Sequence, residues 1–184
     1  MKTTILGIDP GLAFTGYAII NYEKPKFELL SIGTLELGKI DCDVNEKLTI
    51  IYQRIFHFIK EYQVKAFAIE SPFYGKNIQI AIKMGRTQGV CIAAALAHQI
   101  PFYDYAPRKV KQAVTGKGNA SKEMVAGMLQ NIFQTTFDEH FLDATDALAV
   151  AVCHALQSNA YSLGKSKASW KSFIEKNPDR IKKT

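Results

Sequence analysis

Cysteine, tryptophan and long apolar runs are scarce in this 184-residue sequence, which has three cysteines and one tryptophan. No stretch approaches the roughly 18 consecutive apolar residues of a membrane helix, and we recognise no signal peptide. Cys42, Cys91 and Cys153 are scattered without the spacing of metal ligands, so we expect free thiols in a reducing compartment. These absences argue against a membrane protein or a disulfide scaffold, and the cytoplasm is the expected location.

Internal repeats are also absent, and the length fits one domain with an ordinary core. The hydrophobic content of 47% and the charged content of 22% are those of a soluble globular protein. We expect this domain to span residues 1–157. After about Gln157 the pattern dissolves into Ser, Lys and Asn, which predicts a basic, mobile tail over residues 158–184.

Acidic residues are scarce in the middle of the chain, where Asp104 is the one acid between Ser71 and Lys122. The basic residues of that segment are Lys76, Lys83, Arg86, Arg108, Lys109, Lys111, Lys117 and Lys122. The net charge of the whole chain is +6, and the tail is basic as well. A segregated basic surface predicts a polyanionic partner, most often nucleic acid. An ordinary lysine-rich solvated surface is the alternative, and it is more common for a tail than for a middle segment.

The order of apolar runs and turn residues predicts a mixed sheet. Three strands are expected at 4–8, 14–20 and 27–35, then a helix that Asp43 and Glu46 begin as a capping box. A buried strand at 66–69, a long helix at about 77–98, a strand at 101–105, a short helix from Pro107 and a helix capped by Ser121 follow. A strand meander followed by alternating helices and strands indicates an α/β fold with helices on both faces of the sheet.

The closing helix, Phe141 to Leu156, is apolar nearly all round, which is typical of a helix buried against a core. Asp143 and Asp146 lie one turn apart on one face of it, where their charges repel. Unpaired carboxylates on a buried helix are costly, so we expect a cation on that face. The alternative is that both acids lie in the first turn and only favour the helix dipole.

Two further carboxylates stand where strands end, because Asp9 closes the first strand and Glu70 closes the fourth. If these strands are neighbours, the two acids meet there, and the closing helix can bring Asp143 and Asp146 alongside. Four converging carboxylates cannot all stay ionised without cations, and oxygen-only ligands suit Mg²⁺ or Mn²⁺. Two such ions are the usual machinery for displacement at phosphorus, so the joint pattern predicts phosphodiester hydrolysis.

Each residue of this group also has a purely structural interpretation. Asp9 could only end a strand at a turn, and Glu70 could be a solvent-facing strand terminus. A lysine such as Lys111 or Lys122 is, taken singly, more often a surface residue than a catalytic one. Phe73 and Tyr74 could form a base-stacking wedge or fold back as a lid over the core. We expect His154, two turns beyond Asp146, to be structural.

Several motifs, taken together, resemble the RuvC family of Holliday-junction resolvases. They are Gly7-Ile8-Asp9-Pro10-Gly11 with Thr15-Gly16-Tyr17, Ile69-Glu70, Lys76-Asn77, the Gly85–Gly89 helix, Tyr105-Ala106-Pro107-Arg108-Lys109-Val110-Lys111-Gln112, Gly116-Lys117-Gly118, Ala120-Ser121-Lys122 and Asp143-Ala144-Thr145-Asp146-Ala147-Leu148-Ala149. The resemblance covers about residues 3–157 in order and without a large insertion. The tail beyond Gln157 has no matching motif.

The resemblance implies an RNase H-like fold with a central five-stranded mixed sheet and a metal-dependent endodeoxyribonuclease that resolves four-way DNA junctions in recombination and repair. Carried over by motif, the metal ligands would be Asp9, Glu70, Asp143 and Asp146, holding two Mg²⁺ ions per subunit that Mn²⁺ can replace. The DNA-contacting residues would be Phe73, Tyr74, Lys76, Arg108, Lys111, Lys117 and Lys122. Phe73 falls on the loop aromatic that stacks on a base, although Tyr74 beside it leaves open which ring stacks.

The resemblance further implies a homodimer whose two sites face the junction. The helix that carries Gly85 and Gly89 is our candidate for the dimer seam. The family's partner is the RuvA–RuvB branch-migration complex, and its symmetric nicks leave 5′-phosphate and 3′-hydroxyl ends.

Three rival functions stay open at this point. An ATPase of the actin and sugar-kinase type also begins with a strand and an acid, but it needs a duplicated domain that this length does not provide. An RNase H-like protein of RNA processing would share the fold, although the basic middle segment and the Phe73 loop argue against it. A module that binds DNA without cutting it would not need four carboxylates.

Overall fold

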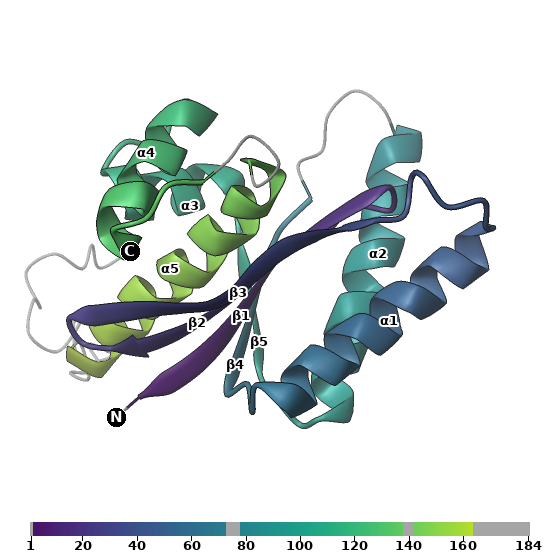
Figure 1. Cartoon of the computed structure of the whole chain (residues 1–184), viewed down its shortest axis with the longest axis horizontal. Coiled ribbons are helices and arrows are strands. Elements are labelled where there is room, and N and C mark those ends of the chain that lie inside the picture. Colours follow the sequence, from purple (N-terminus) through teal and green to yellow (C-terminus); the bar gives the residue numbers. More distant parts are fainter. Residues whose placement is uncertain (1, 73–77, 138–141, 164–184) are drawn as a thin grey trace, which may run out of the picture.

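The structure, a computed structural model, describes residues 2–72, 78–137 and 142–163 (Figure 1). Within α5 the side chains are described from Ala144 to Ser158. The elements follow in the order β1 (Thr3–Asp9), β2 (Phe14–Glu23), β3 (Lys26–Glu36), α1 (Val44–Glu61), β4 (Ala66–Glu70), α2 (Ile78–Ala97), β5 (Phe102–Tyr105), α3 (Pro107–Thr115), α4 (Lys122–Phe133) and α5 (Leu142–Leu163). This order is the one that the sequence predicts.

The five strands form one mixed sheet in the order β3-β2-β1-β4-β5. The first three strands are antiparallel neighbours, whereas β4 runs parallel to β1 and β5 runs parallel to β4. Figure 1 shows the twisted sheet with α1 and α2 on one side and α3, α4 and α5 on the other. The prediction of a five-stranded mixed sheet with helices on both faces is therefore confirmed.

Alternation along β1 and β4 divides the core into two layers, because successive side chains of a strand point to opposite faces. Leu6, Ile8, Phe67 and Ile69 pack in the layer under α1 and α2, whereas Ile5, Ala66 and Ala68 pack in the layer under α5. Full burial of a side chain such as Ile8 or Phe67 stabilises the fold by roughly 1.5–3 kcal/mol. The central strands β1 and β4 are therefore buried on both faces.

The predicted capping box begins α1 as expected. The Asp43 carboxylate accepts a hydrogen bond from the Glu46 N–H, and the Glu46 carboxylate accepts one from the Asp43 N–H. Ser121 caps α4 through one hydrogen bond, which its hydroxyl accepts from the Met124 N–H. The last helix, α5, continues to Leu163, past Gln157, where the apolar pattern weakens.

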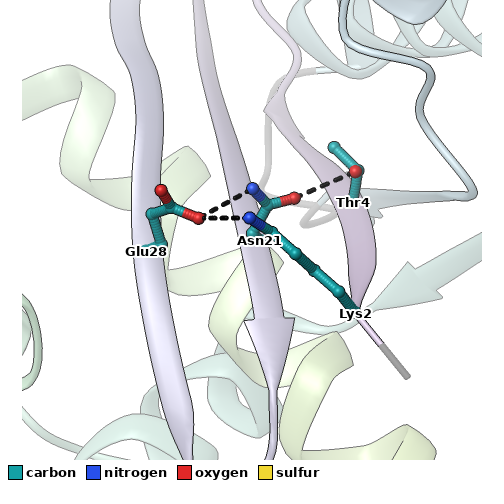
Figure 2. Close-up of polar contacts among 4 residues, drawn as sticks. All are labelled: Lys2, Thr4, Asn21 and Glu28. Atoms are coloured by element: carbon teal, nitrogen blue, oxygen red, sulfur yellow. Dashed lines mark hydrogen bonds and ion pairs between the residues drawn. The ribbon is translucent and has the colours of Figure 1, made fainter.

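A row of polar side chains ties β1, β2 and β3 together (Figure 2), and it lies at the opposite end of β1 from Asp9. Thr4 donates to the Asn21 carbonyl at 3.0 Å, and the Asn21 amide donates to Glu28 at 2.9 Å. Lys2 pairs with the same Glu28 oxygen at 2.8 Å, and these hydrogen bonds lower the pKa of Glu28. Because Thr4, Asn21 and Glu28 are direct cross-strand partners, a slip of one residue would break the row.

In the described part of the chain, every helix is too short or too polar to cross a membrane.

Candidate functional site

Asp9 and Glu70 stand side by side at the carboxyl ends of two neighbouring parallel strands. The register pairs Ile8 of β1 with Ile69 of β4, so the next residue on each strand is the acid. Alternation directs both acids toward the face that α5 covers, because Ile8 and Ile69 belong to the opposite layer. The sequence predicts that Asp9 and Glu70 meet if their strands are neighbours, and β1 and β4 are indeed neighbours.

Gly7 allows α5 to pack directly on β1. A Cβ atom at Gly7 would lie 2.3 Å from the carbonyl oxygen of Ala147 and 2.8 Å from the backbone nitrogen of Ala151, distances that real Cβ atoms do not adopt. Asp146 precedes Ala147 on this helix, so the close approach brings its carboxylate to the end of β1. Asp143 lies one turn earlier along the helix, and its side chain is outside the described residues.

The electrostatics of Glu70 show that three of the four acids share one region. Burial raises the pKa of Glu70, and the negative charges of Asp9 and Asp146 raise it further, to about 8. Lys122 and Lys111 oppose this increase, so both ammonium groups are close enough to act on the same carboxyl. Three of the four sequence-predicted carboxylates and two of the predicted lysines thus lie together.

Lys122 makes a direct ion pair in this region. Its Nζ lies 2.7 Å from Oδ2 of Asp146. The Asp146 side chain is 24% exposed, whereas the lysine side chain is 67% exposed, so the ammonium reaches the acid from the solvent side. The sequence predicts that a cation shares the face of Asp146, and the described cation there is an ammonium group.

The turn after β1 is held by contacts that sequence reasoning did not predict. Thr15 is buried, and its hydroxyl donates to the Gly11 carbonyl oxygen at 2.6 Å. A Cβ atom on Gly11 would lie 2.3 Å from the Phe14 carbonyl oxygen, so only glycine fits this tight turn. A glycine inside an apolar strand, such as Gly7, is the available signal that another backbone approaches closely.

The donor chemistry of this region fits a hard divalent cation. Its side chains offer carboxylate oxygens, and mutual repulsion among them is relieved by added positive charge. Among the side chains described, however, no three acids, histidines or cysteines are placed to hold one ion together. The side chain of the fourth predicted ligand, Asp143, is not among those described.

The remaining predicted DNA-contacting residues lie on α3, in the loop that follows it, or outside the described residues. Arg108 is the second residue of α3 and packs over the next loop, where a Cβ on Gly118 would lie 2.7 Å from the arginine Cγ. Lys117 is exposed in that loop. Phe73, Tyr74 and Lys76 lie outside the described residues.

His154 lies eight residues beyond Asp146 on α5 and is buried. Its Nδ1 and the hydroxyl of Tyr105 are 2.8 Å apart, and its ring packs on Tyr103 with the centroids 4.3 Å apart. Burial lowers the pKa of His154 to about 4. A hollow of about 650 Å³ adjoins this pair between β5 and α5. The contacts agree with the expectation of a structural histidine.

A family model described as "Crossover junction endodeoxyribonuclease RuvC" matches residues 5–154, a span that includes Asp9, Glu70, Asp143 and Asp146. The chain belongs to the RuvC family. The actin and sugar-kinase alternative is therefore excluded, and the family resemblance is confirmed.

Curated RuvC relatives match nearly the whole chain. A crossover junction endodeoxyribonuclease RuvC from Cytophaga hutchinsonii is 48% identical over 178 residues, which are 97% of this chain and 88% of that protein. The RuvC of Porphyromonas gingivalis is 45% identical over 97% of this chain and 96% of its own length.

Solved RuvC structures share the fold. The Thermus thermophilus RuvC structure has a TM-score of 0.77 at 29% identity and covers 86% of this chain and 97% of its own. T. thermophilus RuvC in complex with a Holliday junction substrate has a TM-score of 0.79 at 29% identity, covering 87% and 97%. The RNase H-like fold predicted from sequence is thus confirmed.

Proposed function

We propose that this RuvC-family chain is an endodeoxyribonuclease that resolves four-way DNA junctions by paired, symmetric hydrolysis of phosphodiester bonds in recombination and repair. The observation that carries the proposal is the meeting of Asp9, Glu70 and Asp146, from three separate elements, at the carboxyl ends of β1 and β4. The T. thermophilus relative described in complex with a Holliday junction substrate supports the choice of DNA. Each cut would leave a 5′-phosphate and a 3′-hydroxyl end.

The four acids are proposed as metal ligands, with Asp143 completing the set. Two Mg²⁺ ions per subunit, replaceable by Mn²⁺, would supply an activated water and stabilise the leaving 3′ oxygen. The protein's own part is to hold these carboxylates in a fixed array. Gly7 and the tight turn at Gly11 contribute by fixing α5 and the end of β1.

The basic residues beside the acids are proposed to bind the DNA backbone. Lys111 and Lys122 act near the scissile phosphate, since both influence Glu70. Arg108 and Lys117 extend the positive surface along α3 and its following loop. Phe73 or Tyr74 stacks on a base near the crossover, and Lys76 follows them in the same basic segment.

The exposed face of α2 is proposed to form the seam of a homodimer. Ile78 is 71% exposed, and Ile82 and Leu96, which share its face of the helix, are exposed as well. A Cβ atom at Gly85 or Gly89 would meet nothing within 4 Å, so a second backbone has room to approach there. A two-fold dimer would supply the two equivalent sites that paired nicks require.

We also propose a division of the chain into two parts, a partner complex and a cellular compartment. Residues 1–157 would carry the nuclease and residues 158–184 a basic extension that binds DNA or a partner. The partner complex would be RuvA–RuvB. A reducing cytoplasm suits Cys42, Cys91 and Cys153, which are free thiols.

The deciding experiment is cleavage of a synthetic four-way junction with labelled arms, with and without Mg²⁺, beside a linear duplex and an RNA–DNA hybrid. We expect paired, symmetric nicks that require the metal ion and spare both controls. Preferential cleavage of the hybrid would favour RNA processing. Junction binding without nicks in Mg²⁺ and in Mn²⁺ would favour a binding module that does not cut.

A further inference from the structure

The ammonium group of Lys122 lies beside the Asp146 carboxylate, in a region with several negative charges. The two residues are 24 positions apart in the sequence, one at the start of α4 and the other in the first turns of α5. Their contact of 2.7 Å is a charge-assisted hydrogen bond of ordinary length. The pairing therefore depends on how α4 docks beside α5 and not on local helix geometry.

The surroundings explain why a cation is attracted to this position. Glu70 is largely buried, and Asp9 and Asp146 both act on it with the same sign of charge. A group of neighbouring carboxylates is stabilised by any cation that can reach it. Lys122 provides such a charge from within the chain.

The same geometry allows the ammonium to leave. The Lys122 side chain is 67% exposed, and Lys122 is the first residue of α4. The start of this helix is secured independently by the Ser121 hydroxyl, which accepts a hydrogen bond from the Met124 N–H at 3.3 Å. Rotation of the lysine away from Asp146 would therefore leave the helix cap intact.

We propose that Lys122 and a divalent metal ion compete for Asp146, so that the ammonium is the resident cation of the metal-free site and moves out when the ion binds. This proposal rests on the proposed metal ligands. Once displaced, the ammonium becomes available to a DNA phosphate at the edge of the site. The position of the Lys122 side chain then depends on whether the ion is bound. This role is additional to its proposed contact with DNA.

The competition makes a definite prediction for metal binding in the absence of DNA. Removing the lysine should tighten the binding of Mn²⁺, because the ion no longer displaces a partner of Asp146. Exposed ion pairs of this kind contribute modestly, so we expect about a two- to fivefold tighter Kd. A purely catalytic lysine that contacts only DNA would leave this Kd unchanged.

The test is calorimetric titration of Mn²⁺ into DNA-free protein, using the parent, Lys122→Met, Lys111→Met and Asp146→Asn. Lys111 is the matched control, because it also acts on Glu70 but has no described ion pair with Asp146. Removing either lysine lowers the positive potential near the acids, whereas only Lys122→Met removes the competitor. Tighter binding in Lys122→Met than in Lys111→Met supports the proposal, provided that circular dichroism shows both variants folded.

Other outcomes separate this proposal from the one on which it rests. Equal tightening in the two lysine variants, or none in Lys122→Met, would overturn the exchange while leaving the metal ligands in place if Asp146→Asn binds Mn²⁺ more weakly. Binding of Mn²⁺ that is the same in the parent and in Asp146→Asn would overturn both proposals. A parent that binds no Mn²⁺ without DNA would also overturn the exchange.

Discussion

Gly7 of β1 lies so close beneath Ala147 of α5 that a methyl group on the glycine would stand 2.3 Å from the alanine carbonyl oxygen. This contact fixes the height of α5 above the sheet. Because Asp146 is the neighbour of Ala147, the contact also fixes the distance between the helix acid and the strand acids.

Replacement of Gly7 by alanine should therefore affect both stability and cleavage. Overpacking at this contact is expected to cost about 1–3 kcal/mol of the free energy of unfolding. Displacement of Asp146 should lower the cleavage rate by about tenfold or more. Gly127→Ala in α4 is the control, since a Cβ there meets nothing within 4 Å. Urea unfolding and junction cleavage of the two variants provide the measurement, and equal behaviour would contradict the packing role of Gly7.

Asp146→Asn should separate binding from chemistry. The amide removes a charged metal ligand, so we expect cleavage of the junction to fall by at least about a hundredfold. Junction binding in metal-free buffer should be unchanged or tighter, because one negative charge near the phosphates is lost. Gel-shift and cleavage assays on the same labelled junction measure both quantities. A variant that cuts at nearly the parent rate would remove Asp146 from the proposed ligands.

Ile82→Glu should dissociate the proposed dimer. The substitution places a charge on the exposed apolar face of α2, where burial of an unpaired carboxylate is unfavourable. Sedimentation of the parent should give the mass of two chains, and the variant should give the mass of one. Ile40→Glu is the matched control, because Ile40 is similarly exposed but lies outside α2. If the parent sediments as one chain without DNA, a dimer would form only on the bound junction.

His154 should make the stability of the fold depend on pH. Its pKa in the fold is lowered to about 4 by burial, whereas the ordinary value is near 6.5. Between these values the unfolded chain binds more protons, so the stability present above about pH 6.5 is lost as the pH falls toward 4. The groups that face the ring are Tyr103, Tyr105 and the nearby Lys109.

The variant His154→Gln should show a shallower loss of stability on acidification, by up to about 3 kcal/mol over this window. Urea unfolding at several pH values between 4 and 7.5 measures the slope. His57→Gln, at an exposed position on α1, is the control that should behave like the parent. Identical slopes in all three proteins would mean that His154 is not held neutral by the fold.

Deletion of residues 164–184, which leaves α5 complete, should weaken junction binding and flatten its salt dependence. The deleted segment carries seven basic residues and two acidic ones. Each lost phosphate contact should reduce the slope of log K against log salt by about 0.9. Filter binding between 50 and 200 mM salt, ranges over which such slopes are measured, tests this role. If the slope of log K against log salt is unchanged, the segment does not bind the junction, and it would instead bind a partner protein.

Periodicity and turn residues were sufficient to predict the elements of the fold. The apolar runs at 4–8 and 66–69 predicted buried strands, and Asp43 with Glu46 predicted the start of α1. The acids of the site followed from their places at strand ends and on a buried helix. Those signals are local in the sequence, so one chain is enough to detect them.

Contacts between distant segments could not be predicted in this way. The pairing of Lys122 with Asp146 depends on the docking of two helices, and that of Tyr105 with His154 joins residues 49 positions apart. Asn21 lies just beyond the strand predicted at 14–20, although it belongs to β2 and its side-chain amide connects three strands. A single sequence contains no signal for such partners, because their choice depends on register and on packing angles.

The acidic centre draws its members from β1, β4 and α5, which lie far apart along the chain. During synthesis the first strand and its aspartate therefore leave the ribosome long before the helix that completes the group. A nascent chain that ends before α5 holds only Asp9 and Glu70, without Asp146 or the surface of α5 that faces Gly7. Truncated translation products should consequently be unable to nick DNA, because the last helix must dock before a complete centre exists.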